Sequence, residues 1–142
     1  MVEMGFFSSE VAFFRALSGF LVQFGIAGDP SVQKRFDDLH GGRGGLPDDP
    51  QWLPAGPPGR EINGVTRYQK GYLSYAGAGK NSRGTQLIMA LEHNKYLGGG
   101  SPWEVPWGQL VGESSLAAID HMYTKYGEKV SQVSHASASG GC

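Results

Sequence analysis

Short apolar runs separated by glycine and serine make up much of the chain, and their lengths favour strands over helices. The first two runs, residues 13–17 and 20–25, are rich in aromatic and aliphatic side chains, and Ser18 and Gly19 lie between them. Two such runs around a Ser-Gly pair are typical of an antiparallel hairpin. We therefore predict a hairpin in this part of the chain.

Three later runs have the same character. Residues 68–76 and 85–91 predict two further strands joined by the loop GAGKNSRG, and residues 107–111 predict a short one. Residues 28–66 are instead rich in Gly, Pro and Asp. That composition predicts a long surface excursion, with one short helix near residues 32–39.

One clear helical pattern occupies residues 113–126. Its apolar side chains recur three and four positions apart, at Leu116, Ile119, Met122 and Tyr123. Many short strands with one or two short helices favour a mainly β fold, an antiparallel sheet or barrel, over a doubly wound α/β fold.

Composition narrows the class of protein further. The 142 residues suit one domain, and the 23 glycines, about 16% against a usual ~7%, agree with many turns. There are 12 basic and 13 acidic residues without a basic stripe, so nucleic acid is excluded as the main partner. Because no apolar run approaches the ~18 residues of a membrane span, no membrane association is expected.

The sequence leaves the compartment and the oligomeric state open. A single cysteine, Cys142, permits no intrachain disulfide, which suits a reducing compartment. The first ten residues, MVEMGFFSSE, lack the basic and apolar regions of a signal peptide. A cytoplasmic location is the default interpretation, and a targeting segment upstream of Met1 is the alternative.

Familiar catalytic motifs do not fit the sequence. In GAGKNSRG, Lys80 is followed by Asn81 rather than Ser or Thr, and Ser74 stands where a phosphate-binding loop needs its first glycine. The four histidines have no metal-ligand spacing, and there is no G-x-S-x-G nucleophile elbow. We therefore expect no metal and no cofactor.

One arginine interrupts the apolar stretch FFRALSGFLVQFGIAGDP. Side chains alternate along a strand, so Phe13, Arg15 and Leu17 are expected on one face. In a hairpin, Leu21 and Gln23 of the next strand can lie beside them. Arg15 then stands next to an apolar patch and a glutamine amide, or it is an ordinary exposed arginine on the outside of a barrel. The pattern alone leaves both interpretations open.

Two blocks of the sequence resemble the cyclophilins. In FFRALSGFLVQFGIAGDP, the spacing of Arg15, Phe20 and Gln23 matches a cyclophilin segment in which Arg is followed by Gly-Phe and then Gln. The block GYLSYAGAGKNSRGTQLIMAL is similar to the family's G-x-L-S-M-A-x-A-G-x-N-x-x-G-(S/T)-Q-F-F-I. Its matching residues are Leu73, Ser74, Ala76, Ala78, Gly79, Asn81, Gly84 and Gln86. A third, weaker block is VPWGQLVGE, and the resemblance extends from about residue 1 to residue 132.

The resemblance implies an eight-stranded antiparallel β-barrel capped by two helices. Residues 1–132 are expected to form this cyclophilin-like domain, and residues 133–142 a disordered tail. The first two strands, most of the first helix and the last strand of the family have no counterpart in the sequence, so we expect an incomplete barrel. Open sheet edges favour association or instability. The expected chain is a fragment, a truncated gene product or a piece that a partner completes, and it is marginally stable alone.

The resemblance also implies peptidyl-prolyl cis-trans isomerase activity, with a proline-containing peptide or an unfolded protein as the partner. Rotation about a peptide bond meets a barrier of ~18–20 kcal/mol and needs no nucleophile. A cation that hydrogen-bonds the twisted amide, beside a dry pocket for the proline ring, lowers this barrier. The implied catalytic residues are Arg15 and Gln23. The implied substrate-binding residues are Phe20, Leu21, Ala76, Gly77, Ala78, Gln86, Ile88 and Leu97.

Several positions depart from the family pattern. Leu21 stands for a methionine, Ile88 for a phenylalanine, and Gly77 for an asparagine that pairs with the substrate backbone. Glu104 lies near the place of a histidine. Trp107 is added to the substrate-binding set as an aromatic candidate, with packing in the core as its alternative. These changes imply weakened or lost catalysis, so the alternative function is a non-catalytic module that binds proline peptides or scaffolds a complex.

Overall fold

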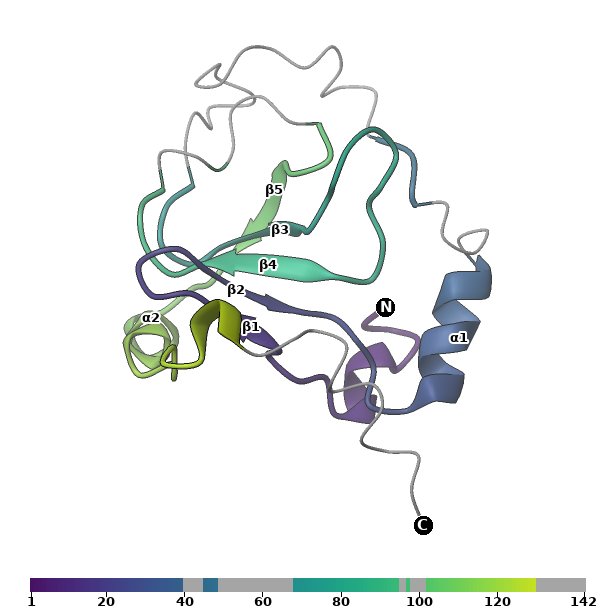
Figure 1. Ribbon diagram of the computed structural model, residues 1–142, viewed down its shortest axis with the longest axis horizontal. Helices are drawn as coiled ribbons and strands as arrows, with labels where there is room; N and C mark the ends of the chain where they lie inside the picture. Colours follow the sequence, from purple (N-terminus) through teal and green to yellow (C-terminus); the bar gives the residue numbers. More distant parts are fainter. Residues whose placement is uncertain (40–44, 49–67, 95–96, 98–101, 130–142) are drawn as a thin grey trace.

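The computed structural model describes residues 1–39, 45–48, 68–94, 97 and 102–129. Its strands form one antiparallel sheet in the spatial order β1-β2-β4-β3-β5 (Figure 1). The strands are β1 (Arg15–Ala16), β2 (Leu21–Phe24), β3 (Tyr72–Tyr75), β4 (Leu87–Ala90) and β5 (Pro106–Gln109). The helices are α1 (Pro30–Leu39) and α2 (Glu113–Asp120), with the short 3-10 helices η1 (Phe6–Ser9) and η3 (Gly127–Lys129).

The hairpin predicted near the beginning of the chain is confirmed. β1 and β2 pair antiparallel, with Arg15 opposite Gln23 and Ala16 opposite Val22. Gly19 in the turn has a φ of 66°, in the left-handed region that glycine enters without strain. Because directly paired residues project to the same face of a sheet, this register places the side chains of Arg15 and Gln23 next to each other.

Phe13 does not share the face of Arg15 as the alternation predicted. β1 begins only at Arg15, and the Phe14 N–H donates to the carbonyl of Gln23, so the residues before Arg15 are outside the regular register. The Phe13 ring packs on Phe24 instead, with 5.2 Å between the ring centres. Phe13 is thereby held on the opposite side of the sheet.

The two faces of the sheet bury different clusters because side chains alternate along β2 and β4. On one face, which we call the arginine face, Arg15 and Gln23 accompany a first cluster. Its buried members are Leu21, Tyr68, Ile88, Ala90 and Leu97. On the other, the cavity face, α2 covers part of the sheet and completes a second cluster. Its buried members are Val22, Met89, Leu91 and Ile119.

A third cluster lies where α1 packs against η1. Phe6 and Phe36 are almost completely buried and meet edge to face, with 4.9 Å between the ring centres. The short helix predicted near residues 32–39 is confirmed, and it begins two residues earlier, at Pro30. Proline is favoured in the first turn of a helix, and the Asp29 carboxylate accepts the Ser31 N–H at 2.8 Å.

α2 is shorter than the helical pattern predicted. It ends at Asp120 rather than near residue 126. At this end, the His121 N–H donates to the carbonyls of Ala118 and Ile119. Met122 still packs into the cluster under α2, although it lies beyond the end of the helix. The turn after α2 thus packs Met122 against the cluster but leaves Tyr123 59% exposed, and η3 then contacts β1.

The described strands are shorter than predicted and do not close into a barrel. β2 ends before Gly25, whose φ is 100° and where a Cβ would lie 2.2 Å from the Thr85 carbonyl oxygen. β1 and β5 are the two edges of the sheet, and no strand in the described ranges joins them. The described residues thus form an open five-stranded sheet where an incomplete barrel was expected, and the architecture is mixed α/β rather than mainly β.

Two expectations concern segments that lie wholly or mostly outside the described residues. The predicted tail, residues 133–142, and most of the predicted excursion lie outside the described residues. None of the helices in the described ranges has the length and apolar character needed to cross a bilayer.

Candidate functional site

A row of three polar side chains runs across the arginine face, from Arg15 on β1 through Gln23 on β2 to Gln86 just before β4. The Gln23 amide is buried and joins its neighbours. Its Nε2 donates to Oε1 of Gln86 at 2.7 Å, and its Oε1 accepts from Nη1 of Arg15 at 3.4 Å. The amide group therefore orients the guanidinium, because its oxygen can only accept and its nitrogen can only donate.

An apolar cluster borders this polar row. Leu21 and Ile88 are 4% and 3% exposed and flank Gln23, the first along β2 and the second directly opposite on β4. Phe20 and Ala76 are half-buried and pack against the same cluster. A permanent cation thus stands at the margin of a water-poor apolar surface, where a hydrogen bond to a carbonyl is stronger than in bulk water.

The loop after β3 carries three of the predicted substrate-binding residues. The Ala76 N–H donates to the Gln86 carbonyl at 3.0 Å, which holds this loop beside the polar row. A Cβ on Gly77 would lie 2.7 Å from Trp103, so Trp103 sits directly against the glycine. Ala78 follows and is exposed. Of the two tryptophans in the described ranges, Trp103 is therefore the one adjacent to the predicted groove.

Contacts with a distant segment hold the far end of this loop. Asn81, at a φ of 55°, and Asp48 bond each other's backbone N–H through their side chains, at 3.0 and 3.1 Å. The Arg83 guanidinium lies over the Tyr75 ring, 5.4 Å from its centre, and Arg83 Nε is 3.8 Å from an Asp48 carboxylate oxygen. These contacts hold in place the loop that carries Ala78.

Burial shifts the pKa of two ionisable groups, Tyr68 within the apolar cluster and Glu104 beside it. The Tyr68 hydroxyl donates to the backbone carbonyl of Glu104, and burial raises the pKa of Tyr68. Burial likewise raises the pKa of the Glu104 carboxyl above its ordinary value of 4.5. Leu97, whose carbonyl accepts the Tyr68 N–H at 3.3 Å, is 6% exposed in the same cluster. The described residues thus place Glu104 beside the cluster that also contains Leu97.

The carboxylate of Glu128 in η3 binds the guanidinium of Arg15. Arg15 Nε lies 3.1 and 3.2 Å from the two carboxylate oxygens, and Nη2 donates to Oε1 as well. The hydrogen bonds from Arg15 lower the pKa of the Glu128 carboxyl. Sequence reasoning missed this residue, because 113 positions separate it from Arg15 and it was assigned to no element.

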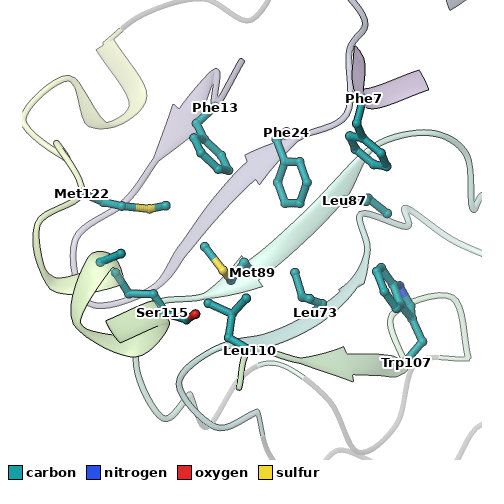
Figure 2. A pocket seen from close by; sticks show the side chains of 12 residues that line it. Phe7, Phe13, Phe24, Leu73, Leu87, Met89, Trp107, Leu110, Ser115 and Met122 are labelled. Atoms are coloured by element: carbon teal, nitrogen blue, oxygen red, sulfur yellow. The ribbon is translucent and has the colours of Figure 1, made fainter. Parts of the chain in front are cut away.

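Trp107 is not brought to this site. It lies on the cavity face, where its ring is 6.1 Å from that of Tyr75 and is 53% exposed. There it borders a cavity of about 470 Å³, in which Phe13 and Phe24 line one side and Leu110 and Trp107 the other (Figure 2). The full lining is Phe7, Phe13, Phe24, Leu73, Leu87, Met89, Trp107, Leu110, Ser115, Ala118, Ile119 and Met122.

The arginine face thus gathers nearly all of the site residues expected from the sequence. It holds Arg15, Gln23, Phe20, Leu21, Ala76, Gly77, Gln86, Ile88 and Leu97 around one patch, with Ala78 at its exposed margin. Within the described residues, no three His, Cys, Asp or Glu side chains are grouped so that they could hold a metal ion. The chemistry that this arrangement offers is hydrogen bonding by a cation next to an apolar surface.

Comparison with known proteins supports the fold. No family model and no curated protein matches the sequence. The structure is similar to that of a cyclophilin-type peptidyl-prolyl cis-trans isomerase from Cryptosporidium parvum, determined in the presence of the dipeptide Ala-Pro, with a TM-score of 0.52 and 20% sequence identity. The match covers 84% of this chain and 65% of that protein. The chain therefore has a cyclophilin-like fold, in agreement with the resemblance in its sequence.

Proposed function

We propose that this protein is a peptidyl-prolyl cis-trans isomerase that binds X–Pro segments of peptides or unfolded proteins on the arginine face. The observation that carries the proposal is the position of Arg15. Its guanidinium is held by the Gln23 amide at the margin of the cluster that contains Leu21 and Ile88. The cyclophilin-like fold and the sequence blocks around Arg15 and Gln86 support the same function.

In the proposed mechanism, the proline ring rests on the half-buried Phe20, at the margin of the apolar cluster that contains Leu21 and Ile88. Arg15 donates a hydrogen bond to the carbonyl of the residue before proline and towards the proline nitrogen, whose lone pair becomes available as the amide twists. This contact is stronger in the twisted state than in either planar isomer, which is the requirement for lowering the barrier. An apolar surround strengthens it by excluding water.

The residues before the proline are proposed to lie along the loop of Ala76, Gly77 and Ala78. Gly77 carries no side chain, and Trp103 packs against it. Trp103 therefore fills the space that a side chain at residue 77 would take, and residue 77 has no side-chain amide to pair with a peptide. We therefore propose a site that recognises the proline ring and the preceding carbonyl with little selectivity for the neighbouring side chains.

A second function, peptide binding without turnover, has an observation in its favour. The guanidinium of Arg15 is engaged by the carboxylate of Glu128, and a cation so engaged is less free to follow a twisting amide. Ile88 also offers less ring-stacking surface than an aromatic residue would. The two functions share a binding site and differ in whether bound peptide exchanges its isomers faster.

The test is a protease-coupled isomerisation assay on an Ala-Pro tetrapeptide, comparing the wild type with Arg15→Ala. The loss of one hydrogen-bond donor to the reacting amide is expected to lower kcat/KM by about 10²–10³-fold. Arg35→Ala, which removes an exposed arginine from α1, is the matched control and is expected to keep full activity. Equal rates for the wild type and Arg15→Ala would exclude the proposed catalysis. Peptide binding that persists at those equal rates would favour the second function.

A further inference from the structure

The contact between Arg15 and Glu128 has a bearing on how the proposed site is used. All three nitrogens of the guanidinium donate to side-chain acceptors: Nε and Nη2 to the carboxylate of Glu128, and Nη1 to the amide of Gln23. A carboxylate oxygen and a peptide carbonyl oxygen seek the same N–H donors. Glu128 therefore occupies the Nε–H and one Nη2–H of Arg15, two of the five N–H groups from which a substrate carbonyl could accept a hydrogen bond.

The two side chains that contact Arg15 differ in burial and in how firmly their own neighbours hold them. Gln23 is 8% exposed, lies in the middle of the sheet and is itself anchored by Gln86. Glu128 has a side chain that is 64% exposed and belongs to a 3-10 helix of three residues at one edge of the sheet. A bidentate pair is geometrically specific, but an exposed pair is weak and screened by salt. The contact to Glu128 is therefore the one that can open.

We propose that Glu128 is an internal competitor for Arg15, which restrains the site until η3 moves aside and is displaced when the carbonyl of an X–Pro segment binds. This proposal rests on the proposed function, since it concerns the same site. It assigns a regulatory role to η3, a segment that carries none of the residues expected from the sequence to bind substrate. Segments or solutes that draw η3 away from β1 would then raise the activity of the site.

The direct test is kcat/KM for an Ala-Pro tetrapeptide with the wild type, Glu128→Gln and the control Glu3→Gln. Glu3 is an exposed glutamate near the beginning of the chain, so both variants change the net charge equally. At low salt, Glu128→Gln is expected to be several-fold more active than the wild type, and Glu3→Gln unchanged. The advantage is expected to shrink as NaCl is raised towards 1 M, where the Debye length falls to about 3 Å. Equal activity of the wild type and Glu128→Gln at low salt would overturn the proposal.

A binding measurement separates failure of this proposal from failure of the proposed function. NMR titration of each protein with the same tetrapeptide reports affinity whether or not turnover occurs. Tighter binding by Glu128→Gln than by the wild type, with no catalysis by either, would sustain the internal competitor and reject the isomerase. Equal affinities, or no measurable binding by either protein, would overturn the competitor. A shift of the Arg15 Nε–H signal in Glu128→Gln but not in Glu3→Gln is expected in addition.

Discussion

The two faces of the sheet are built from the same strands but are covered to different extents. Ile88 and Leu87 are neighbours on β4, yet Ile88 faces a closed cluster beside Arg15 and Leu87 lines a cavity. On the arginine face, Tyr68 and Leu97 come from outside the strands to cover the apolar residues. On the cavity face, α2 covers one part and leaves a hollow of about 470 Å³ (Figure 2).

The difference shows that stability and the proposed chemistry are divided unevenly over the sheet. A closed cluster gains packing on all sides, whereas the atoms that line a hollow lose contacts on one side. Phe13 and Trp107, at the rim of the cavity, are 54% and 53% exposed, which is high for such large apolar side chains. We therefore expect the arginine face to dominate the stability of the sheet and the cavity face to tolerate change.

The largest expected effect compares Ile88→Ala with Leu87→Ala. Ile88→Ala removes packing from a closed cluster and should lower the free energy of unfolding by about 3 kcal/mol. Leu87→Ala enlarges an existing hollow, so fewer contacts are lost and the cost should be smaller by about 1 kcal/mol or more. Urea unfolding with a shared m-value measures both. Equal costs, or a larger cost for Leu87→Ala, would contradict the contrast between the faces.

A smaller effect is expected from filling the cavity. Ala118 lies on α2 and lines the cavity, so Ala118→Leu adds apolar atoms to the hollow with little loss of helix propensity. We expect the free energy of unfolding to rise by about 1 kcal/mol. Ala117→Leu, one residue earlier on the same helix and outside the cavity lining, serves as the control and is expected to give no gain. A similar gain from both variants would mean that the cavity is not the cause.

The smallest expected effect concerns Glu104, beside the arginine face. Burial raises the pKa of its carboxyl above 4.5, so the folded protein holds this proton more tightly than the unfolded chain does. Its contribution to stability is therefore fully present below the unfolded pKa and is lost as pH rises through the folded one. Glu104→Gln, which stays neutral, should be more stable than the wild type at pH 7 by a fraction of a kcal/mol.

Thermal unfolding of Glu104→Gln and of the wild type from pH 4 to pH 7 measures this effect. The stability advantage of the variant over the wild type should grow with pH. A constant difference, or an advantage at pH 4 that disappears at pH 7, would mean that the ionisation of Glu104 does not act in the way described.

The part of the fold that depends on local pattern could be predicted from the sequence. Two short runs rich in aromatic and aliphatic side chains and the Ser-Gly pair between them were enough for the hairpin, and the hairpin register brings Arg15 next to Gln23. The family spacing then associated Ile88, Gln86 and the loop at Ala76 with the same site. These residues lie in or next to paired strands, where position along the chain determines the face.

The features that the sequence did not predict depend on register breaks or distant contacts. The pairing of β3 with β5 shifts at Leu73 and Ser74, and Trp107 lies on the cavity face. A shift of one residue in a strand exchanges its faces, and no local pattern reports it. Glu128 reaches Arg15 only because α2 ends at Asp120 and the chain turns back. The cavity depends on how much of the cavity face the other elements leave uncovered, and the periodicity of a single segment does not determine this.

The central claim is that an X–Pro peptide binds the arginine face and that its isomers exchange there. The most direct measurement is NMR of the labelled protein with an Ala-Pro tetrapeptide, recording amide shifts together with the cis–trans exchange of the peptide. We expect shifts at Arg15, Gln23 and Ile88, little change at Trp107, and exchange that is fast with the wild type and slow with Arg15→Ala. Shifts centred on Trp107 and the cavity lining, with exchange unaffected by Arg15→Ala, would contradict the account.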